Sequence, residues 1–185
     1  MRLRPYAEED LRLTRRLESD PRVVGHLGGA GDVQHADRVH RRRIAAVADG
    51  DLFFTILLTR DDSAHDGEGG CGGEEPAGII AVWRAEFGGE PVYELGAMLL
   101  PDHQARGVAG RAFALLLPYV LDSGVRVVHA FPAVSNGPSN AILDKLGFTR
   151  GEECDLDYEG RPLRCAHWVR ELVPDTAGRA PESPS

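Results

Sequence analysis

A glycine-bearing segment between a predicted strand and a predicted helix has the composition of a phosphate-binding turn. Its residues are Gln104, Ala105, Arg106, Gly107, Val108, Ala109, Gly110 and Arg111. Backbone N–H groups in such a turn are exposed near the positive end of the following helix dipole, which suits a diphosphate. The alternative is a tight turn in which Gly107 only permits an unusual backbone dihedral. The segment alone leaves both interpretations open.

Two other nucleotide-binding motifs do not fit this turn. A P-loop requires Gly-x-x-x-x-Gly-Lys followed by Ser or Thr. The only lysine of the chain, Lys145, lies far from the turn. The dinucleotide fingerprint Gly-x-Gly-x-x-Gly is also missing from it. The turn is therefore neither a P-loop nor a dinucleotide-binding turn.

The segment 104–109 matches the first signature of the GNAT N-acetyltransferase superfamily. That signature is Gln or Arg, two variable residues, Gly, one variable residue, and then Gly or Ala. Residues 136–148 resemble the second signature, in which an Asn is followed three positions later by Ser or Ala and the segment ends in Leu-Gly-Phe. Both signatures occur in the expected order and on the expected elements.

Three further segments are similar to the branch of this superfamily that includes the ribosomal-protein N-terminal acetyltransferases. They are Leu3-Arg4-Pro5, Asp20-Pro21 and Tyr93-Glu94-Leu95-Gly96. The resemblance covers roughly residues 1–173 and implies transfer of an acetyl group from acetyl-CoA to a primary amine. It also implies a single α/β domain with helices on both faces of a mixed, mostly antiparallel sheet. That sheet is expected to have about six to seven strands, splayed between the fourth and the fifth.

The resemblance also implies how the cofactor binds. The pantetheine arm of CoA is expected in the gap between the predicted strands 92–100 and 125–131. The acyl carbonyl is expected against residues 98–100, where a backbone N–H would stabilise the oxyanion. The residues expected to contact the cofactor are Met98, Leu99, Leu100, Gln104, Ala105, Arg106, Gly107, Val108, Ala109, Gly110, Arg111, Asn136 and Ser139.

Direct transfer requires a neutral amine, so a side chain or a water molecule must accept a proton. Glu94 is the candidate base, because strand alternation places it on the same face as Met98. An ion-paired or outward-facing carboxylate is the alternative. Many members of the superfamily protonate the leaving thiolate with a Tyr at the position of Leu143, so Ser139 or water is the candidate acid here. Helix capping alone would also explain Ser139 and Asn136.

The candidate acceptor-binding residues are Trp83, Tyr93 and His129. His129 is also a second-choice base, since imidazole titrates in the useful range. Packing in the sheet is the alternative for all three. The acceptor is a protein N-terminus, a small amine metabolite or an amine-bearing antibiotic, and the signatures do not choose among them. A non-catalytic acyl-CoA sensor is the other candidate function, which Leu143 favours.

The elements that must position these residues follow from the hydrophobic pattern. Segment 92–100 is apolar on both faces, as in the middle of a sheet covered on both sides. Residues 111–121 have helical spacing, so the order is strand, glycine turn, helix. The other predicted elements are an edge strand at 1–5, two or three helices before residue 50, strands at 52–58, 77–82 and 125–131, a helix at 136–146, and a hairpin of 148–158 with 163–173.

Composition bounds the function classes. The 185 residues are 42% hydrophobic and 27% charged, which predicts one globular domain. We expect the domain to span residues 1–173, with a flexible loop at 61–76 and a disordered tail at 174–185. The net charge of −8 disfavours nucleic acid and favours cationic substrates.

The remaining expectations concern location, metals and assembly. No apolar run is long enough to span a bilayer and no secretory signal is seen, so a cytoplasmic protein that does not bind membranes is predicted. Cys71, Cys154 and Cys165 show no metal-ligand spacing with His, so no metal site is predicted. Dimers are frequent in the superfamily, so a homodimer is an expectation from the resemblance.

Overall fold

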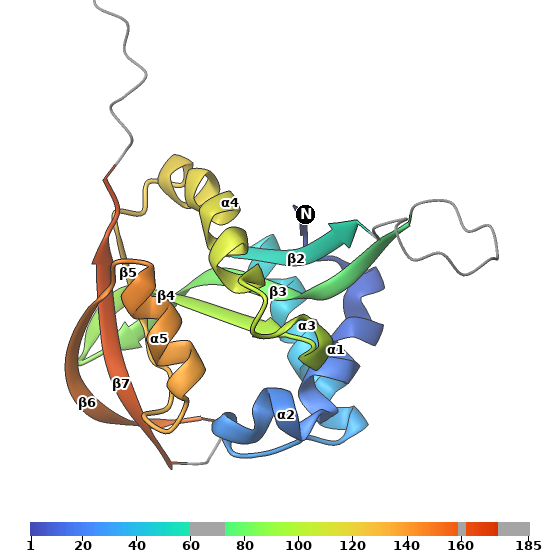
Figure 1. Ribbon diagram of the computed structural model, residues 1–185, viewed down its shortest axis with the longest axis horizontal. Coiled ribbons are helices and arrows are strands. Elements are labelled where there is room, and N and C mark those ends of the chain that lie inside the picture. Colours follow the sequence, from blue (N-terminus) through green and yellow to red (C-terminus); the bar gives the residue numbers. More distant parts are fainter. Residues whose placement is uncertain (60–72, 159–161, 174–185) are drawn as a thin grey trace, which may run out of the picture.

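The computed structural model describes residues 1–59, 73–158 and 162–173. Within these ranges, helices and strands follow one another in the order that the hydrophobic pattern predicts (Figure 1). The strands are β1 (Arg2–Pro5), β2 (Leu52–Thr59), β3 (Glu74–Phe87), β4 (Glu90–Leu99), β5 (Val127–Ala130), β6 (Thr149–Asp157) and β7 (Pro162–Glu171). The α-helices are α1 (Leu11–Ser19), α2 (Pro21–Val24), α3 (Val33–Ala48), α4 (Val108–Asp122) and α5 (Gly137–Lys145).

The strands of the described ranges form one 7-stranded sheet in the order β1-β2-β3-β4-β5-β7-β6. Neighbouring strands are antiparallel except for β4 and β5, which are parallel. The β4–β5 pair is joined at a single register position, Glu94 opposite His129, whereas β4 pairs with β3 along the whole length of β4. The sheet therefore splits between its fourth and fifth strands, and the predicted fold class is confirmed.

Helices cover both faces of the sheet, which strand alternation separates into two cores. On one face, Leu13 and Leu17 of α1 pack with Ile79 of β3, and Met98 of β4 borders this cluster. On the other face, α4 and α5 pack against the larger core, which includes Leu95 of β4. Figure 1 shows α4 and α1 on opposite sides of the central strands. Glu94 and Met98 thus face the α1–α3 side, which we call the acceptor face after the acceptor expected beside Glu94.

Several predicted boundaries differ from the structure. The helix predicted from residue 111 begins at Val108, because Gly107 adopts a left-handed backbone (φ 69°) and serves as its N-cap. The strand predicted at 125–131 is shorter, β5 being four residues long. Residues 74–76 of the predicted loop belong to β3, where they pair with the end of β2. Residues 61–72 of that loop and the predicted tail lie outside the described residues.

None of the described helices is both long and apolar enough to cross a membrane. No group of three or more His, Cys, Asp or Glu side chains in the same ranges is arranged to hold a metal ion.

Candidate active site

The turn between β4 and α4 is built to present backbone amides. Ala105 (φ 56°) is the only non-glycine residue with a left-handed backbone in the described part of the chain, and Gly107 (φ 69°) follows two positions later. Left-handed residues in a turn direct neighbouring N–H groups toward one point, an arrangement that binds anions. The strained Ala105 is a backbone feature of the kind that concentrates at functional sites. The conformation of this turn therefore favours the interpretation as a diphosphate-binding turn over the interpretation as a merely tight turn.

Two side chains fix this turn in place. The amide Nε2 of Gln104 donates to the carbonyl oxygen of Leu99 (3.0 Å), which ties the turn to the end of β4. The guanidinium Nη1 of Arg111 donates to the carbonyl oxygen of Arg106 (3.2 Å) from the first turn of α4. Gly110 lies close to α5, since a Cβ there would meet Ile142 Cδ1 at 3.9 Å. The turn is thus anchored to both β4 and α4 and lies beside α5.

Glu94 is a half-buried carboxylate in the middle of β4. Within the described ranges, no charged group or hydrogen-bond donor contacts it. Burial disfavours the charged form and raises the pKa of Glu94 from 4.5 to about 7. The ion-paired alternative for Glu94 is wrong for the described part of the chain. A carboxylate that titrates near neutral pH is suited to accepting a proton at that pH.

Aromatic side chains border Glu94 on the acceptor face. Trp83 lies directly across from Glu94 in the β3–β4 ladder, and Phe53 stacks on it with ring centroids 5.8 Å apart. The indole covers Gly96, because a Cβ there would lie 2.7 Å from Trp83 Cη2. Tyr93 is adjacent to Glu94 in the strand and therefore points to the opposite face. The structure thus places Trp83 beside Glu94 and Tyr93 on the opposite face of β4, and the acceptor contacts of both aromatic residues remain predictions.

His129 lies on the same face as Glu94, since the two residues are register partners across β4 and β5. Its Nδ1 lies 2.9 Å from Nε2 of His167 on β7, and the two rings stack at 14°. Burial lowers the pKa of both imidazoles, and the neighbouring His129 lowers the pKa of His167 further. Both rings are therefore neutral at pH 7. Glu94, whose pKa is about 7, is a stronger base than His129, whose pKa is depressed below 6.5.

The start of α5 contains the second group of predicted residues. Asn136 is the N-cap, and its Oδ1 accepts a hydrogen bond from the backbone N–H of Ser139 (3.2 Å). Capping thus accounts for the Asn136 side chain but leaves the Ser139 hydroxyl to be explained. Leu143 of α5 is buried in the larger core.

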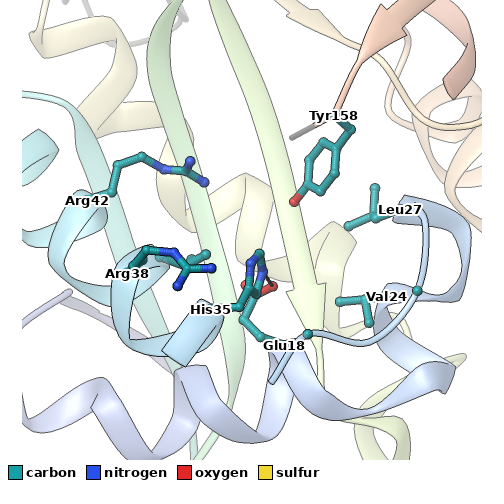
Figure 2. A pocket seen from close by; sticks show the side chains of 10 residues that line it. Glu18, Val24, Leu27, His35, Arg38, Arg42 and Tyr158 are labelled. Atoms are coloured by element: carbon teal, nitrogen blue, oxygen red, sulfur yellow. Dashed lines mark ion pairs between the residues drawn. The ribbon is translucent and has the colours of Figure 1, made fainter. Parts of the chain in front are cut away.

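A cavity of about 510 Å³ opens on the acceptor face between the N-terminal helices and the end of β6. It is lined by Glu18, Val24, Leu27, Gly29, Gly31, His35, Arg38, Val39, Arg42 and Tyr158. Figure 2 shows the guanidinium groups of Arg38 and Arg42 directed into it from α3, with the Tyr158 hydroxyl on the opposite side. Segments that are far apart in the sequence therefore share one cavity wall.

A buried ion pair connects this cavity to β4. Arg43 Nη2 donates to Glu18 Oε1 at 2.7 Å, and the two side chains are only 10% and 3% exposed. The same nitrogen lies 3.4 Å from Met98 Sδ. The cavity wall at Glu18 is thus two contacts away from Met98, the residue expected beside the acyl group.

Replacing Arg43 with Met should lower the free energy of unfolding by about 3 kcal/mol, because Glu18 would remain buried without its main counter-charge. Urea unfolding measures this difference. The double variant Glu18→Gln/Arg43→Met is the control, and it should recover most of the loss because no uncompensated charge remains. If Arg43→Met is as stable as the wild type, the ion pair between Arg43 and Glu18 does not stabilise this part of the fold.

Four residues of the site were not predicted from the sequence: Glu18, Arg43, His167 and Asn140. Asn140 donates from Nδ2 to the carbonyl oxygens of Ala133 (3.0 Å) and Asn136 (2.8 Å), and it accepts from Trp168 Nε1 (2.9 Å). The only feature of the sequence that could have identified Asn140 was its place in the second signature. The other three belong to ordinary charged or alternating patterns and are brought to the site by tertiary contacts.

Solved structures with the same fold cover nearly the whole chain. A putative acetyltransferase from Salmonella typhimurium with acetyl-CoA bound has a TM-score of 0.65 and 18% identity, covering 99% of this chain and 98% of that chain. Spermidine N-acetyltransferase from Vibrio cholerae, in complex with CoA and spermine, has a TM-score of 0.67 and 14% identity, with 92% and 94% covered. An acetyltransferase from Salmonella typhimurium that modifies the N-terminal serine of ribosomal protein L7/L12 has a TM-score of 0.68 and 14% identity, with 92% and 94% covered.

These structures show a shared fold, and their acceptors differ. One is crystallised with a polyamine, and another modifies a protein N-terminus. Among curated protein sequences, no relative matches the chain. The family model described as acetyltransferase (GNAT) domain matches residues 1–149, which include the split strands, the amide-presenting turn and α5. The chain therefore belongs to the GNAT acetyltransferase family.

Proposed function

We propose that this protein transfers an acetyl group from acetyl-CoA directly to a primary amine. The observation that carries the proposal is the end of β4–β5 pairing at Glu94, next to a turn whose left-handed residues gather amides at the start of α4. A diphosphate on that turn would direct the rest of CoA along the open edge of β4. The family model supports the same ligand.

One backbone amide is well placed to polarise the acyl carbonyl. The N–H of Leu100 is occupied, because it donates to the carbonyl oxygen of Ala77 (2.8 Å). Successive residues of a strand direct their amides to alternate sides, so the N–H of Leu99 points toward the split. We assign the oxyanion-stabilising role to the Leu99 amide, out of the three residues 98–100 first considered.

The proposed proton transfers use one side chain on β4 and one on α5. The Glu94 carboxylate, directly or through water, takes a proton from the acceptor amine as the amine attacks the acyl carbon. The tetrahedral intermediate then collapses, the carbon–sulfur bond breaks and the thiolate leaves. The hydroxyl of Ser139, or water, returns a proton to that sulfur. His129 and Trp83 border the acceptor side of this reaction.

Free-thiol release from acetyl-CoA, measured across a panel of primary amines, tests the proposal. Steady turnover with at least one amine, and an N-acetylated product by mass spectrometry, is the expected result. Tight binding of acetyl-CoA without turnover of any amine would instead support the acyl-CoA sensor.

Ser139→Ala should lower kcat by at least about tenfold if the hydroxyl is the acid. Stability should stay within about 0.5 kcal/mol, since the Asn136 cap bonds the backbone N–H of residue 139, which alanine retains. Ser123→Ala, at the far end of α4, is the matched control and should leave kcat unchanged. An unaltered rate in Ser139→Ala would assign the proton donation to water.

A further inference from the structure

Two histidines on neighbouring strands share a hydrogen bond on the acceptor face. His129 of β5 is a candidate acceptor contact, whereas His167 of β7 has no part in the proposed proton transfers. Nδ1 of His129 lies 2.9 Å from Nε2 of His167, and the two rings are within 14° of parallel. The protonation state of one ring nitrogen therefore sets the state of the nitrogen that it meets.

Aromatic rings hold the imidazole of His167 in one orientation. Phe131 stacks on it with ring centroids 5.0 Å apart, and Phe87 packs against it at 4.5 Å. Nδ1 of His167 lies beside the exposed Gly151, where a Cβ would approach this nitrogen to 3.4 Å. Solvent at this exposed position can accept a proton from Nδ1. The fixed ring thus presents its Nε2 to His129.

The strand order determines where the second nitrogen of His129 points. β5 lies between β4 and β7 in the sheet, and the two nitrogens of an imidazole point to opposite sides of the ring. Nδ1 is directed toward His167 on β7. Nε2 is therefore directed away from β7, toward the side of β4 where Glu94 is the register partner. Among the described residues, none forms a hydrogen bond with this nitrogen.

An ammonium group requires hydrogen-bond acceptors around it, because it carries three donors and no acceptor. The ionised carboxylate of Glu94 supplies one acceptor. Nε2 of His129 supplies a second only when the ring is neutral and its proton is on Nδ1. Burial lowers the pKa of both imidazoles, so both are neutral at pH 7. A proton on Nδ1 of His129 must be donated to Nε2 of His167, which then has to be unprotonated.

We propose that His167 is a positioning residue that holds His129 in the Nδ1–H tautomer, so that Nε2 of His129 accepts a hydrogen bond from the acceptor amine. The inference rests on the proposed acetyl transfer and adds a positioning residue to it. His129 binds the amine before Glu94 removes a proton, and it keeps one N–H in place while the nitrogen lone pair attacks the acyl carbon. His167 touches neither substrate nor cofactor and acts through His129.

NMR measures the tautomer of His129 directly. Two-dimensional ¹H–¹⁵N spectra of protein labelled with ¹⁵N-histidine distinguish Nδ1–H from Nε2–H rings, and His129→Asn assigns the signal. We expect the Nδ1–H form in the wild type. His167→Phe keeps an aromatic ring against Phe131 but removes the hydrogen-bond acceptor, so His129 should lose this preference. An Nε2–H ring in the wild type, or an unchanged Nδ1–H ring in His167→Phe, would overturn the proposal.

Kinetics should show the loss as weaker binding of the acceptor. The amine probes are spermidine, serinamide and Ser-Ala-Ala-amide, and the fastest of them is used for all variants. His167→Phe should raise its KM about tenfold or more with kcat changed less than about threefold, because a hydrogen bond to a charged group is lost in binding. His167→Gln, whose side-chain oxygen can replace Nε2, should keep KM within about threefold of wild type. A wild-type KM in His167→Phe contradicts the positioning role.

Phe131→Leu is the matched control for packing. It removes the ring stacked on His167 but leaves the nitrogens of both histidines in place. Its KM and its His129 tautomer should match the wild type, and a KM raised as much as in His167→Phe would assign the effect to packing and overturn the proposal. If none of the amines is acetylated, the proposed acetyl transfer fails. The NMR comparison of wild type with His167→Phe then still decides whether His167 sets the tautomer of His129.

Discussion

Glu94→Gln should lower kcat by about 10² to 10⁴, the range expected when a positioned general base is removed. The amide is nearly isosteric with the carboxylate, so packing against Trp83 across the β3–β4 ladder is retained. Acetyl-CoA affinity should stay the same, because the binding turn lies at the other end of β4. Steady-state kinetics at saturating acetyl-CoA measures the loss.

The pH profile gives an independent signature of the same carboxylate. Since burial raises the pKa of Glu94 to about 7, the basic form is scarce below that pH. The wild-type rate should therefore fall tenfold for each pH unit below about 7 and level off above it. In Glu94→Gln, the residual activity should no longer show this acidic limb, the fall in rate below about pH 7.

Although Glu94→Gln should lower the activity, it should raise the free energy of unfolding at neutral pH. The folded pKa of about 7 lies above the ordinary value of 4.5, so the folded state holds a proton that the unfolded chain releases. The carboxylate therefore destabilises the fold progressively as pH rises from about 4.5 to 7. Below pH 4, Glu94→Gln should have the same free energy of unfolding as the wild type. At pH 8 the variant should be more stable than the wild type, by up to about 3 kcal/mol.

Glu90→Gln, at the exposed start of the same strand, is the matched control and should alter neither the rate nor the pH limb. If Glu94→Gln keeps its full rate, the general base is water or His129 rather than Glu94. A lost rate accompanied by lost stability would indicate a structural role instead.

Gly110→Asp should weaken CoA binding by at least about tenfold while the fold is kept. An aspartate in the first turn of α4 places a negative charge beside the turn proposed to hold the diphosphate. Two like charges within about 6 Å repel by roughly 3 kcal/mol near a protein surface, more than the 1.4 kcal/mol that a tenfold change requires. Calorimetry with CoA measures the effect.

The fold should tolerate this change. A Cβ at residue 110 meets its nearest neighbour at 3.9 Å, which is ordinary contact. An acid in the first turn also interacts favourably with the helix dipole, so the melting temperature should hold or rise. Ala114→Asp, one turn further along the exposed side of α4, is the charge-matched control and should bind CoA more strongly than Gly110→Asp does.

Salt provides a further check on the mechanism of the loss. The deficit of Gly110→Asp should shrink as ionic strength rises, because screening weakens the repulsion. An affinity equal to that of wild type at low salt would mean that the diphosphate does not bind this turn.

The sequence by itself determined the features that are encoded locally. The order of strand, glycine turn and helix around Gly107 follows from spacing within a short segment, as does the boundary of α5 at Asn136. Even there, the exact start of α4 depended on the left-handed backbone of Gly107, which the sequence permits but does not require. Glu94 was identified because strand alternation places it on the same face as Met98.

The tertiary structure decided which distant residues meet. The register that sets Glu94 beside His129, the His129–His167 contact, and the cavity that joins α3 to Tyr158 all connect segments far apart in the chain. Local propensities carry no information on such pairs, because the free energy that fixes them comes from packing the whole sheet between its helices.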